Sequence, residues 1–280
     1  MSLFVQTQLS TPSQLLIELA AFAGGCGWTI DLNVDVSNRR RLHLHSGSAH
    51  FELYAYNNDR IYCYACTGYD AAKAHNDQPG TTSPYRDFYI AGSSGQPAWF
   101  VSCGGALYVA VLYQGSEYRW IALIESFAKI GAWEGGQCLW VSENSSNNLG
   151  LFGRDALSAG TYNIPLLRLN NAWTAQAAPG LCGSVGYNDL AAGKTVNLYN
   201  GGLSPQPVVL FLTSPQDSSK LHPIGFAPGV YRCNCADLYA IGDTIEISGT
   251  TYLALPYVAP QLGVFDTWFF GDLLFALSVV

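Results

Sequence analysis

The feature that most restricts the fold is a series of short segments, apolar or alternating between apolar and polar residues, that are separated by turn-forming residues. The segments cover Arg41–His45, His50–Tyr56, Arg60–Cys66, Ala98–Ser102, Ala106–Tyr113, Arg119–Glu125, Gln137–Val141, Thr195–Tyr199, Val208–Thr213, Val230–Cys235, Thr244–Ile247 and Thr251–Pro256. Each is of strand length, and clusters of Gly, Asn, Asp and Pro lie between them. This spacing is typical of antiparallel sandwiches or barrels and not of βαβ units.

One helix is signalled near the N-terminus. Thr11 can cap it, Pro12 suits its first position, and Gln14 completes a capping box. An apolar stripe over residues 15–23 follows, and Gly24-Gly25 predicts the end. The sequence therefore predicts a mainly β protein, an antiparallel β-sandwich or barrel-like fold with one short N-terminal α-helix and long loops.

The domain organisation follows from length and from the absence of a linker signal. A globular chain of 280 residues buries roughly three quarters of the surface that its unfolded form exposes. The polar, glycine-bearing stretch at residues 142–160 predicts a long surface loop or a break. We expect a single large domain over residues 1–280, with two packed lobes that meet near residues 142–160 as the alternative.

Composition limits the partners. Only 12% of the residues are charged while 13% are aromatic, so part of the surface is expected to meet other protein. The net charge of −7 argues against nucleic acid as a partner. The basic run Arg39-Arg40-Arg41 is interpreted as a solvated turn or a guard on an edge strand. Membrane insertion is not expected, because Asp266, Gly271 and Asp272 interrupt the apolar C-terminus. The N-terminus lacks a leader pattern, which predicts use without export.

The candidate motifs for catalysis are incomplete. Gly193-Lys194-Thr195 ends like a phosphate-binding loop, but Asn188 occupies the position that needs the first glycine. No GxSxG nucleophile elbow is present, and no pair of carboxylates is identifiable as a glycosidase pair. The sequence therefore predicts no catalytic residues and no cofactor-binding residues, and the protein is not expected to be an enzyme.

Two patterns have metal-like spacing. His43 and His45 would share one face of a strand, but Glu52 lies too far along to join them, and His50 would face the other side of an unbroken strand. We expect partly exposed strand histidines and no metal ligands there. Cys63 and Cys66 would point to opposite faces of a strand, and Cys233-Asn234-Cys235 is not a matched pair. The eight cysteines are expected to be reduced and buried, with a metal at either pair left open.

Three segments carry a family resemblance. They are Tyr118–Trp140 (YRWIALIESFAKIGAWEGGQCLW), Leu15–Ile30 (LLIELAAFAGGCGWTI) and Ile224–Pro256 (IGFAPGVYRCNCADLYAIGDTIEISGTTYLALP). Together they resemble virion structural proteins of tailed bacteriophages over most of the chain. The resemblance implies a tail, baseplate or neck component, made in the host bacterial cytoplasm and located in the virion. It would pack against copies of itself in a symmetric ring and against other virion proteins. It brings no catalytic or metal-binding residues with it.

The contact elements of such a subunit would be the loops at Asp70–Tyr85 and Ser142–Gly160. The alternative is a carbohydrate-binding or host-receptor-binding β-sandwich module, which would expose tryptophan beside carboxylates and bind a host-surface glycan. Trp120 and Trp140 lie in strand-like runs and are expected in the core, whereas Trp133 lies near a turn and is the plausible exposed anchor. A phage-associated hydrolase is a third and weaker hypothesis.

Overall fold

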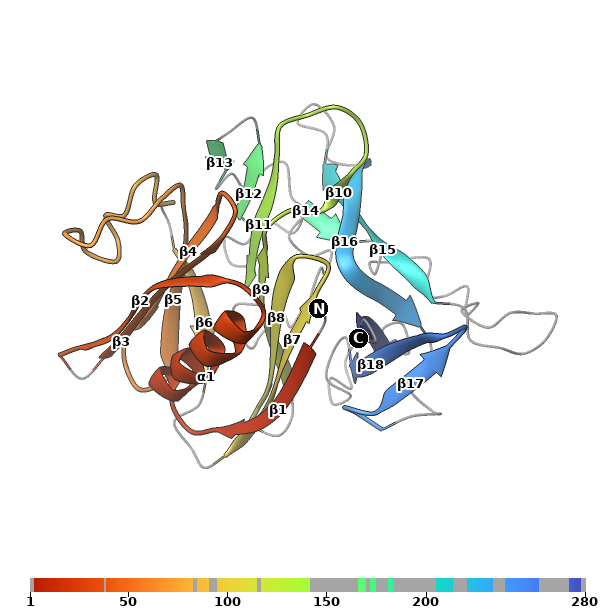
Figure 1. The fold of residues 1–280 in the computed structure, drawn as a ribbon, viewed down its shortest axis with the longest axis horizontal. Coiled ribbons are helices and arrows are strands. Elements are labelled where there is room, and N and C mark those ends of the chain that lie inside the picture. Colours follow the sequence, from red (N-terminus) through yellow and green to blue (C-terminus); the bar gives the residue numbers. More distant parts are fainter. Residues whose placement is uncertain are drawn as a thin grey trace.

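The computed structural model describes residues 3–37, 39–82, 85–90, 95–114, 117–141, 166–169, 172–174, 181–183, 205–213, 221–233, 240–256 and 272–277. Within these ranges the chain forms one helix and nineteen strands, and the strands pair into three antiparallel sheets (Figure 1). The helix in this part of the chain is not long and apolar enough to cross a membrane.

The first sheet is a meander of five consecutive strands. Its order is β2 (Thr29–Val36), β3 (Arg39–Ser46), β4 (Ala49–Ala55), β5 (Arg60–Cys66) and β6 (Arg86–Tyr89). Each strand pairs with its neighbour in sequence, so short turns connect β2 to β5 and a longer segment joins β5 to β6. We call this the meander sheet.

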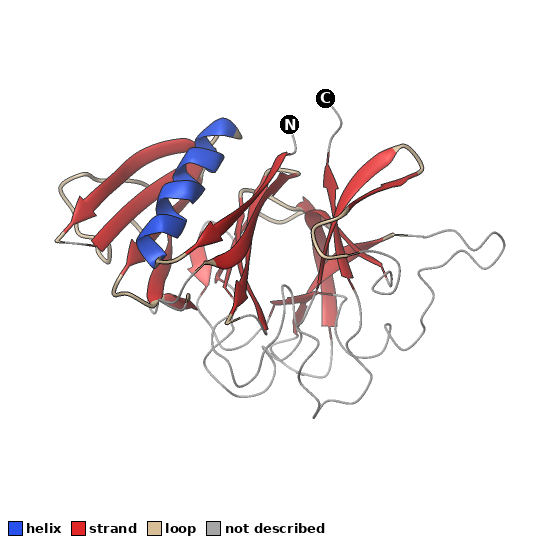
Figure 2. Ribbon diagram, turned by 90° about the horizontal axis from the view of Figure 1, so that it is seen from below, coloured by secondary structure: helices blue, strands red, loops and turns tan. Residues whose placement is uncertain are grey.

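The second sheet lies in the middle of the molecule, and the third lies on its far side (Figure 2). The central sheet has the order β1 (Leu3–Leu9), β7 (Gln96–Cys103), β8 (Ala106–Tyr113), β9 (Glu117–Ile124), β11 (Gly135–Val141), β12 (Leu166–Leu169) and β13 (Ala172–Thr174). The third sheet has the order β14 (Leu181–Gly183), β15 (Gln206–Thr213), β16 (Leu221–Cys233), β19 (Asp272–Leu277), β18 (Thr250–Pro256) and β17 (Thr244–Ile247), and β10 (Ala128–Lys129) also pairs with β16.

The central sheet is apolar on both faces because a core lies on each side of it. Along β7, Phe100 packs toward the meander sheet, whereas Trp99 and Val101 pack toward the third sheet. Side chains alternate between the faces of a strand, so a strand buried on both sides reads as a nearly continuous apolar run. This explains why β8 and β9 lack a polar face in the sequence.

Helix α1 (Pro12–Gly25) completes the core between the central and meander sheets. The Thr11 hydroxyl accepts a hydrogen bond from the Gln14 backbone N–H at 3.1 Å, as the capping box predicts. The Gln14 side chain in turn accepts from the Ser10 N–H at 2.9 Å. Leu15, Leu16, Leu19, Ala20 and Ala23 form the buried face of the helix, against both sheets.

The structure confirms the predicted fold class, a mainly β protein with antiparallel sheets in sandwich-like packing and one N-terminal helix. The described strands form open sheets and not a closed barrel. The sequence analysis missed β1, β2, β6 and β19 among others. The predicted strand at Thr195–Tyr199, the GKT segment and the stretch at residues 142–160 lie outside the described residues.

The interpretation of the basic run was wrong. Arg39, Arg40 and Arg41 lie in β3, which has β2 on one side and β4 on the other, so they occupy neither a turn nor an edge strand. Arg40 binds across to β2, where its Nε donates to Asn33 at 2.8 Å. The three cations are built into the meander sheet by cross-strand partners.

Candidate functional site

The β3–β4 hairpin brings together polar residues that the chain spaces apart. Its turn at Gly47-Ser48 sets a register in which His45 lies opposite His50 and His43 lies opposite Glu52. Directly opposed residues in an antiparallel pair point to the same face. Gly47 takes the left-handed conformation, φ +54°, that such a tight turn requires. All four side chains therefore share the face of the meander sheet that is turned away from the central sheet.

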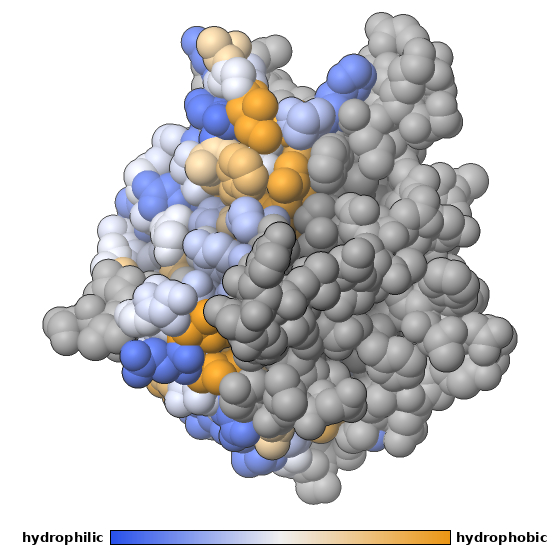
Figure 3. Space-filling view, turned by 90° about the vertical axis from the view of Figure 1, so that its right-hand side faces the viewer, coloured by the Kyte–Doolittle hydropathy of each residue, from blue (hydrophilic) through white to orange (hydrophobic). Residues whose placement is uncertain are grey.

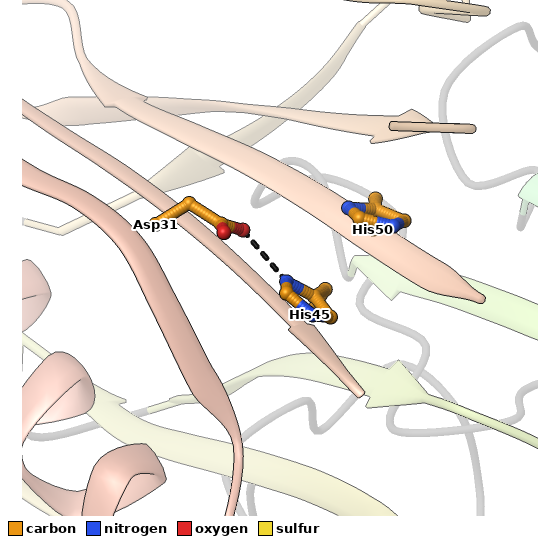
Figure 4. A group of neighbouring side chains, drawn as sticks. All are labelled: Asp31, His45 and His50. Atoms are coloured by element: carbon orange, nitrogen blue, oxygen red, sulfur yellow. Dashed lines mark hydrogen bonds and ion pairs between the residues drawn. The ribbon is translucent and has the colours of Figure 1, made fainter. Parts of the chain in front are cut away.

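A β-bulge in β2 adds a carboxylate to this face. The pairing of β2 with β3 shifts between Ile30, which faces Leu44, and Leu32, which faces His43. One residue, Asp31, is therefore extra, and it joins Leu32 in opposing His43. A bulge of this kind re-aims a side chain, and here it directs the Asp31 carboxylate toward the histidines (Figure 4).

The imidazoles and carboxylates are in direct contact. Asp31 Oδ2 lies 2.7 Å from His45 Nδ1 and 3.8 Å from His43 Nε2. His43 Nε2 lies 3.3 Å from His50 Nδ1, and the His45 and His50 rings stack with their centroids 4.5 Å apart. We call Asp31, His43, His45 and His50 the histidine cluster.

The buried carboxylate of Glu52 contacts the cluster through His43 and fixes the orientation of that ring. Glu52 is fully buried, and its Oε2 lies 3.0 Å from His43 Nδ1 while its Oε1 accepts from Arg41 Nε at 2.7 Å. Arg41 can only donate, so Glu52 accepts from it, and we assign His43 Nδ1 as the donor to the second Glu52 oxygen. The other ring nitrogen of His43, Nε2, then carries the lone pair and lies on the side of His50 and Asp31.

The loop that follows β5 covers part of this face. Arg41 Nη1 donates to the Lys73 carbonyl at 3.2 Å, and the Tyr69 ring packs on His43 with centroids 4.8 Å apart. Inside the loop, the buried side chain of Gln78 donates to the Asp70 and Lys73 carbonyls. The part of the predicted Asp70–Tyr85 loop that is described thus packs on the sheet and is organised by its own hydrogen bonds.

The surroundings of His50 favour its neutral form. Burial, with smaller contributions from His45 and His43, lowers the pKa of His50 to about 4. His50 is therefore uncharged at neutral pH and has a free lone pair. One ligand atom each from Asp31, His45 and His50 lies within 4.8 Å of the other two, which is the grouping that a metal ion needs.

The sequence-based reasoning about these histidines was wrong in three respects. His43 and His45 do share a face, as predicted, but His43 is fully buried and not partly exposed. Glu52 is not too far away, and His50 does not face the other side, because β3 ends at Ser46 and the chain turns back at Gly47-Ser48 into β4. Asp31 was missed altogether, since a bulge leaves no mark in the pattern of a single strand.

Of the cysteines whose side chains are described, all but Cys26 are buried, as expected, and Cys26 is partly buried. Five cysteines have described side chains and form no disulfide with one another: Cys26, Cys63, Cys66, Cys103 and Cys138. As predicted, Cys63 and Cys66 point to opposite faces of β5, and burial raises the pKa of Cys66 to about 12. These two thiols do not converge on one site. The side chain of Cys233 and the whole of Cys235 lie outside the described part of the chain.

The tryptophans do not form an exposed platform in the described residues. Trp120 and Trp140 are buried in the core next to the third sheet, as predicted. Trp133, the proposed exposed anchor, is only partly exposed: its ring packs on Phe127, and its indole N–H donates to the Ile130 carbonyl at 3.3 Å. Lys129 also lies over the ring at 5.4 Å.

Stacked tyrosines occupy the other end of the meander sheet. The rings of Tyr56 and Tyr62 are 4.4 Å apart and those of Tyr62 and Tyr85 are 4.0 Å apart, both nearly parallel. The Arg39 guanidinium lies 4.7 Å over Tyr56. These ring faces are thus in contact with one another or with a cation.

Comparison with known protein families finds none whose model matches this chain, and no curated protein sequence matches it.

Proposed function

We propose that the chain is a structural subunit of a tailed-phage virion, in the tail, baseplate or neck, and that it acts through protein–protein assembly with copies of itself and with other virion proteins. Two things support this proposal: the resemblance of three segments to that class of protein, and the edge strand β1, which has none of the usual protective devices within its own seven residues. The second is the structural observation that carries it.

Strand β1 forms an edge of the central sheet. Among the described strands it pairs with β7 alone, in an unbroken register from Leu3–Ser102 to Leu9–Gln96. It contains no charged residue, no proline and no bulge over its seven residues, LFVQTQL. Soluble proteins usually protect an edge with one of these devices, because an unpaired row of backbone groups is a template for another strand.

The side chains of β1 add apolar surface to that edge. Phe4 is 36% exposed and Val5 is 45% exposed, and they lie on opposite faces of the strand. Strand addition at such an edge would supply main-chain hydrogen bonds and bury both side chains. We therefore assign β1 as a contact element, with a strand of a second copy as the occupant.

Other surface features agree with an assembly role. The side of the molecule at the right of Figure 1 shows apolar patches beside polar ones on the described residues (Figure 3). On the third sheet, Ile241 is 48% exposed in the turn before β17. Surface of this kind is typical of interfaces between subunits.

The alternative, a carbohydrate-binding module, receives less support from the geometry. Sugar rings stack on the faces of aromatic side chains, but the faces of Tyr56 and Tyr62 contact Arg39 and neighbouring tyrosines. The described tryptophans are buried or only partly exposed. This surface does not supply the platform that the alternative requires.

Light scattering with negative-stain imaging of the same peak tests the proposal. Unaltered protein is expected to form a ring or another defined oligomer. Val5→Lys places a charge on the edge and should shift the mass toward the monomer. Ile17→Lys is the matched control, since Ile17 is similarly exposed, at 44%, but belongs to α1 and not to the edge strand. A stable monomer would refute the assembly role, and an oligomer that both variants retain would refute the role of β1.

A further inference from the structure

The potential ligand atoms of the histidine cluster lie close together, as they do around a metal ion. Asp31, His45 and His50, from three adjacent strands, each offer one ligand atom within 4.8 Å of the other two. His43 Nε2 lies beside this group, 3.3 Å from His50 Nδ1 and 3.8 Å from Asp31 Oδ2. We propose that Asp31, His43, His45 and His50 bind one Zn²⁺ ion, which joins β2, β3 and β4. This inference goes beyond the assembly role and does not depend on it.

Two of the distances between ligand atoms are close to those around one tetrahedral ion. Zinc–nitrogen and zinc–oxygen bonds of about 2.0–2.1 Å place tetrahedral ligand atoms roughly 3.3 Å from one another. His43 Nε2 and His50 Nδ1 are 3.3 Å apart, and His43 Nε2 and Asp31 Oδ2 are 3.8 Å apart. The His45 Nδ1 to Asp31 Oδ2 distance of 2.7 Å is that of a hydrogen bond, and it lengthens when both atoms bind the ion.

The surroundings of His43 are those of a metal ligand. Metal-binding histidines commonly donate their second ring N–H to a carboxylate, which fixes the ring and raises its basicity. Glu52 holds His43 Nδ1 in this way at 3.0 Å, and Arg41 holds Glu52 at 2.7 Å. The chain of contacts Arg41–Glu52–His43 leaves Nε2 as the one nitrogen of His43 that faces the cluster.

The ligand types select the ion and its role. Imidazole with one carboxylate suits first-row transition metals and is a poor set for Ca²⁺ or Mg²⁺, which take oxygen ligands. Four protein ligands close the coordination shell, as in structural zinc sites, whereas a catalytic zinc keeps a position open for water. The ion therefore acts as a cross-link between strands and not as a reaction centre.

Because the bulge brings Asp31 of β2 to the cluster, a bound ion would hold β2 against the β3–β4 hairpin. Strand β2 is an edge of the meander sheet, paired with β3 alone among the described strands. Asp31 is the residue of β2 that reaches the cluster, so coordination ties this edge strand to both strands of the neighbouring hairpin. Removal of the ion should loosen β2 before the rest of the sheet.

The test uses untagged protein treated with a chelator and then dialysed. Calorimetric titration with ZnCl₂ should show one ion per chain, Zn²⁺ should raise the thermal midpoint, and Co²⁺ in place of Zn²⁺ should give the intense visible bands of a tetrahedral site. His50→Gln and Asp31→Asn each remove one ligand while keeping the side-chain size. Both should weaken Zn²⁺ binding by more than the roughly 10–100-fold expected of Glu52→Gln, which removes only the carboxylate behind His43.

His75→Gln is the control, because His75 is half-buried against Tyr54 and lies outside the cluster. It should bind Zn²⁺ as the unaltered protein does. Circular dichroism checks that each variant keeps its sheet content. The proposal is overturned if the unaltered protein binds no Zn²⁺ at millimolar concentration. It is equally overturned if correctly folded His50→Gln and Asp31→Asn bind as tightly as the unaltered protein, or if only thiol alkylation abolishes binding.

Discussion

The buried pair of Arg41 and Glu52 gives the sharpest test of how the meander sheet is held together. Glu52 is fully buried and accepts hydrogen bonds from Arg41 Nε at 2.7 Å and from His43 Nδ1. Arg41→Met retains most of the side-chain volume and removes the guanidinium. It leaves a carboxylate in the sheet with one partner, and it also removes the hydrogen bond to the Lys73 carbonyl.

The magnitude follows from the burial of the carboxylate. Removing one partner of a buried ion pair costs about 3–5 kcal/mol, because the remaining charge is neither solvated nor compensated. Replacing both partners with apolar residues of similar volume is often close to neutral. We therefore expect the free energy of unfolding to fall by about 3 kcal/mol or more in Arg41→Met, and by less in the double variant Arg41→Met/Glu52→Met.

Equilibrium unfolding in urea, followed by tryptophan fluorescence and by circular dichroism, measures these differences if the two signals coincide. Metal-free protein is used throughout, so that ion binding does not enter the comparison. A loss below about 0.5 kcal/mol in Arg41→Met, the range of ordinary surface substitutions, would refute the reasoning. The reasoning would also be refuted if the double variant lost as much free energy of unfolding as Arg41→Met and Glu52→Met lose together when each is made alone.

Three further outcomes are expected. Tyr108→Phe removes a buried hydroxyl that donates to the Pro228 carbonyl at 2.9 Å, and it should cost about 1–2 kcal/mol in the free energy of unfolding. Gly229→Ala should cost about 2 kcal/mol or more in urea unfolding, because Gly229 has φ +64° and an added Cβ would lie 2.7 Å from Cys103 Cβ. Burial lowers the pKa of His75, so its stabilising contribution is present above the unfolded value of about 6.5 and is lost as the pH falls below it. His75→Phe should therefore show a shallower loss of stability than the unaltered protein between about pH 7 and pH 5, and an equal loss would contradict this.

Local signals in the sequence were enough for part of the fold. The cap at Thr11, the proline at the first helical position and the glycines at the end predicted α1 almost to the residue. Alternation predicted the strands that have one polar face, such as β4 and β5. The strand β2, TIDLNVDV, has the same alternation and was missed although its signal was present.

The pairing of distant segments has no local signal. Strand β1 pairs with β7, more than eighty residues later, and the central sheet separates two cores whose partners come from both halves of the chain. Hydrophobic pattern gives the faces of a strand, but not which strand lies beside it.

Part of the histidine cluster could have been predicted from the sequence. The segments Arg41–His45 and His50–Tyr56 were both predicted as strands, and the Ser-Gly-Ser turn between them implies a hairpin that places His45 opposite His50. Treating the strand as unbroken caused the error. Asp31 depends on the register shift between Ile30 and Leu32, which arises from tertiary pairing and not from local propensity.

The compactness of the histidine cluster along the chain has a consequence for biogenesis. All of its members, and Glu52 behind them, lie between residues 31 and 52, within two successive hairpins. Closing such short loops is fast, whereas the pairing of β1 with β7 must await a much later part of the chain. The cluster can thus assemble on the ribosome before the central sheet exists, and the proposed Zn²⁺ would stabilise these hairpins at that stage.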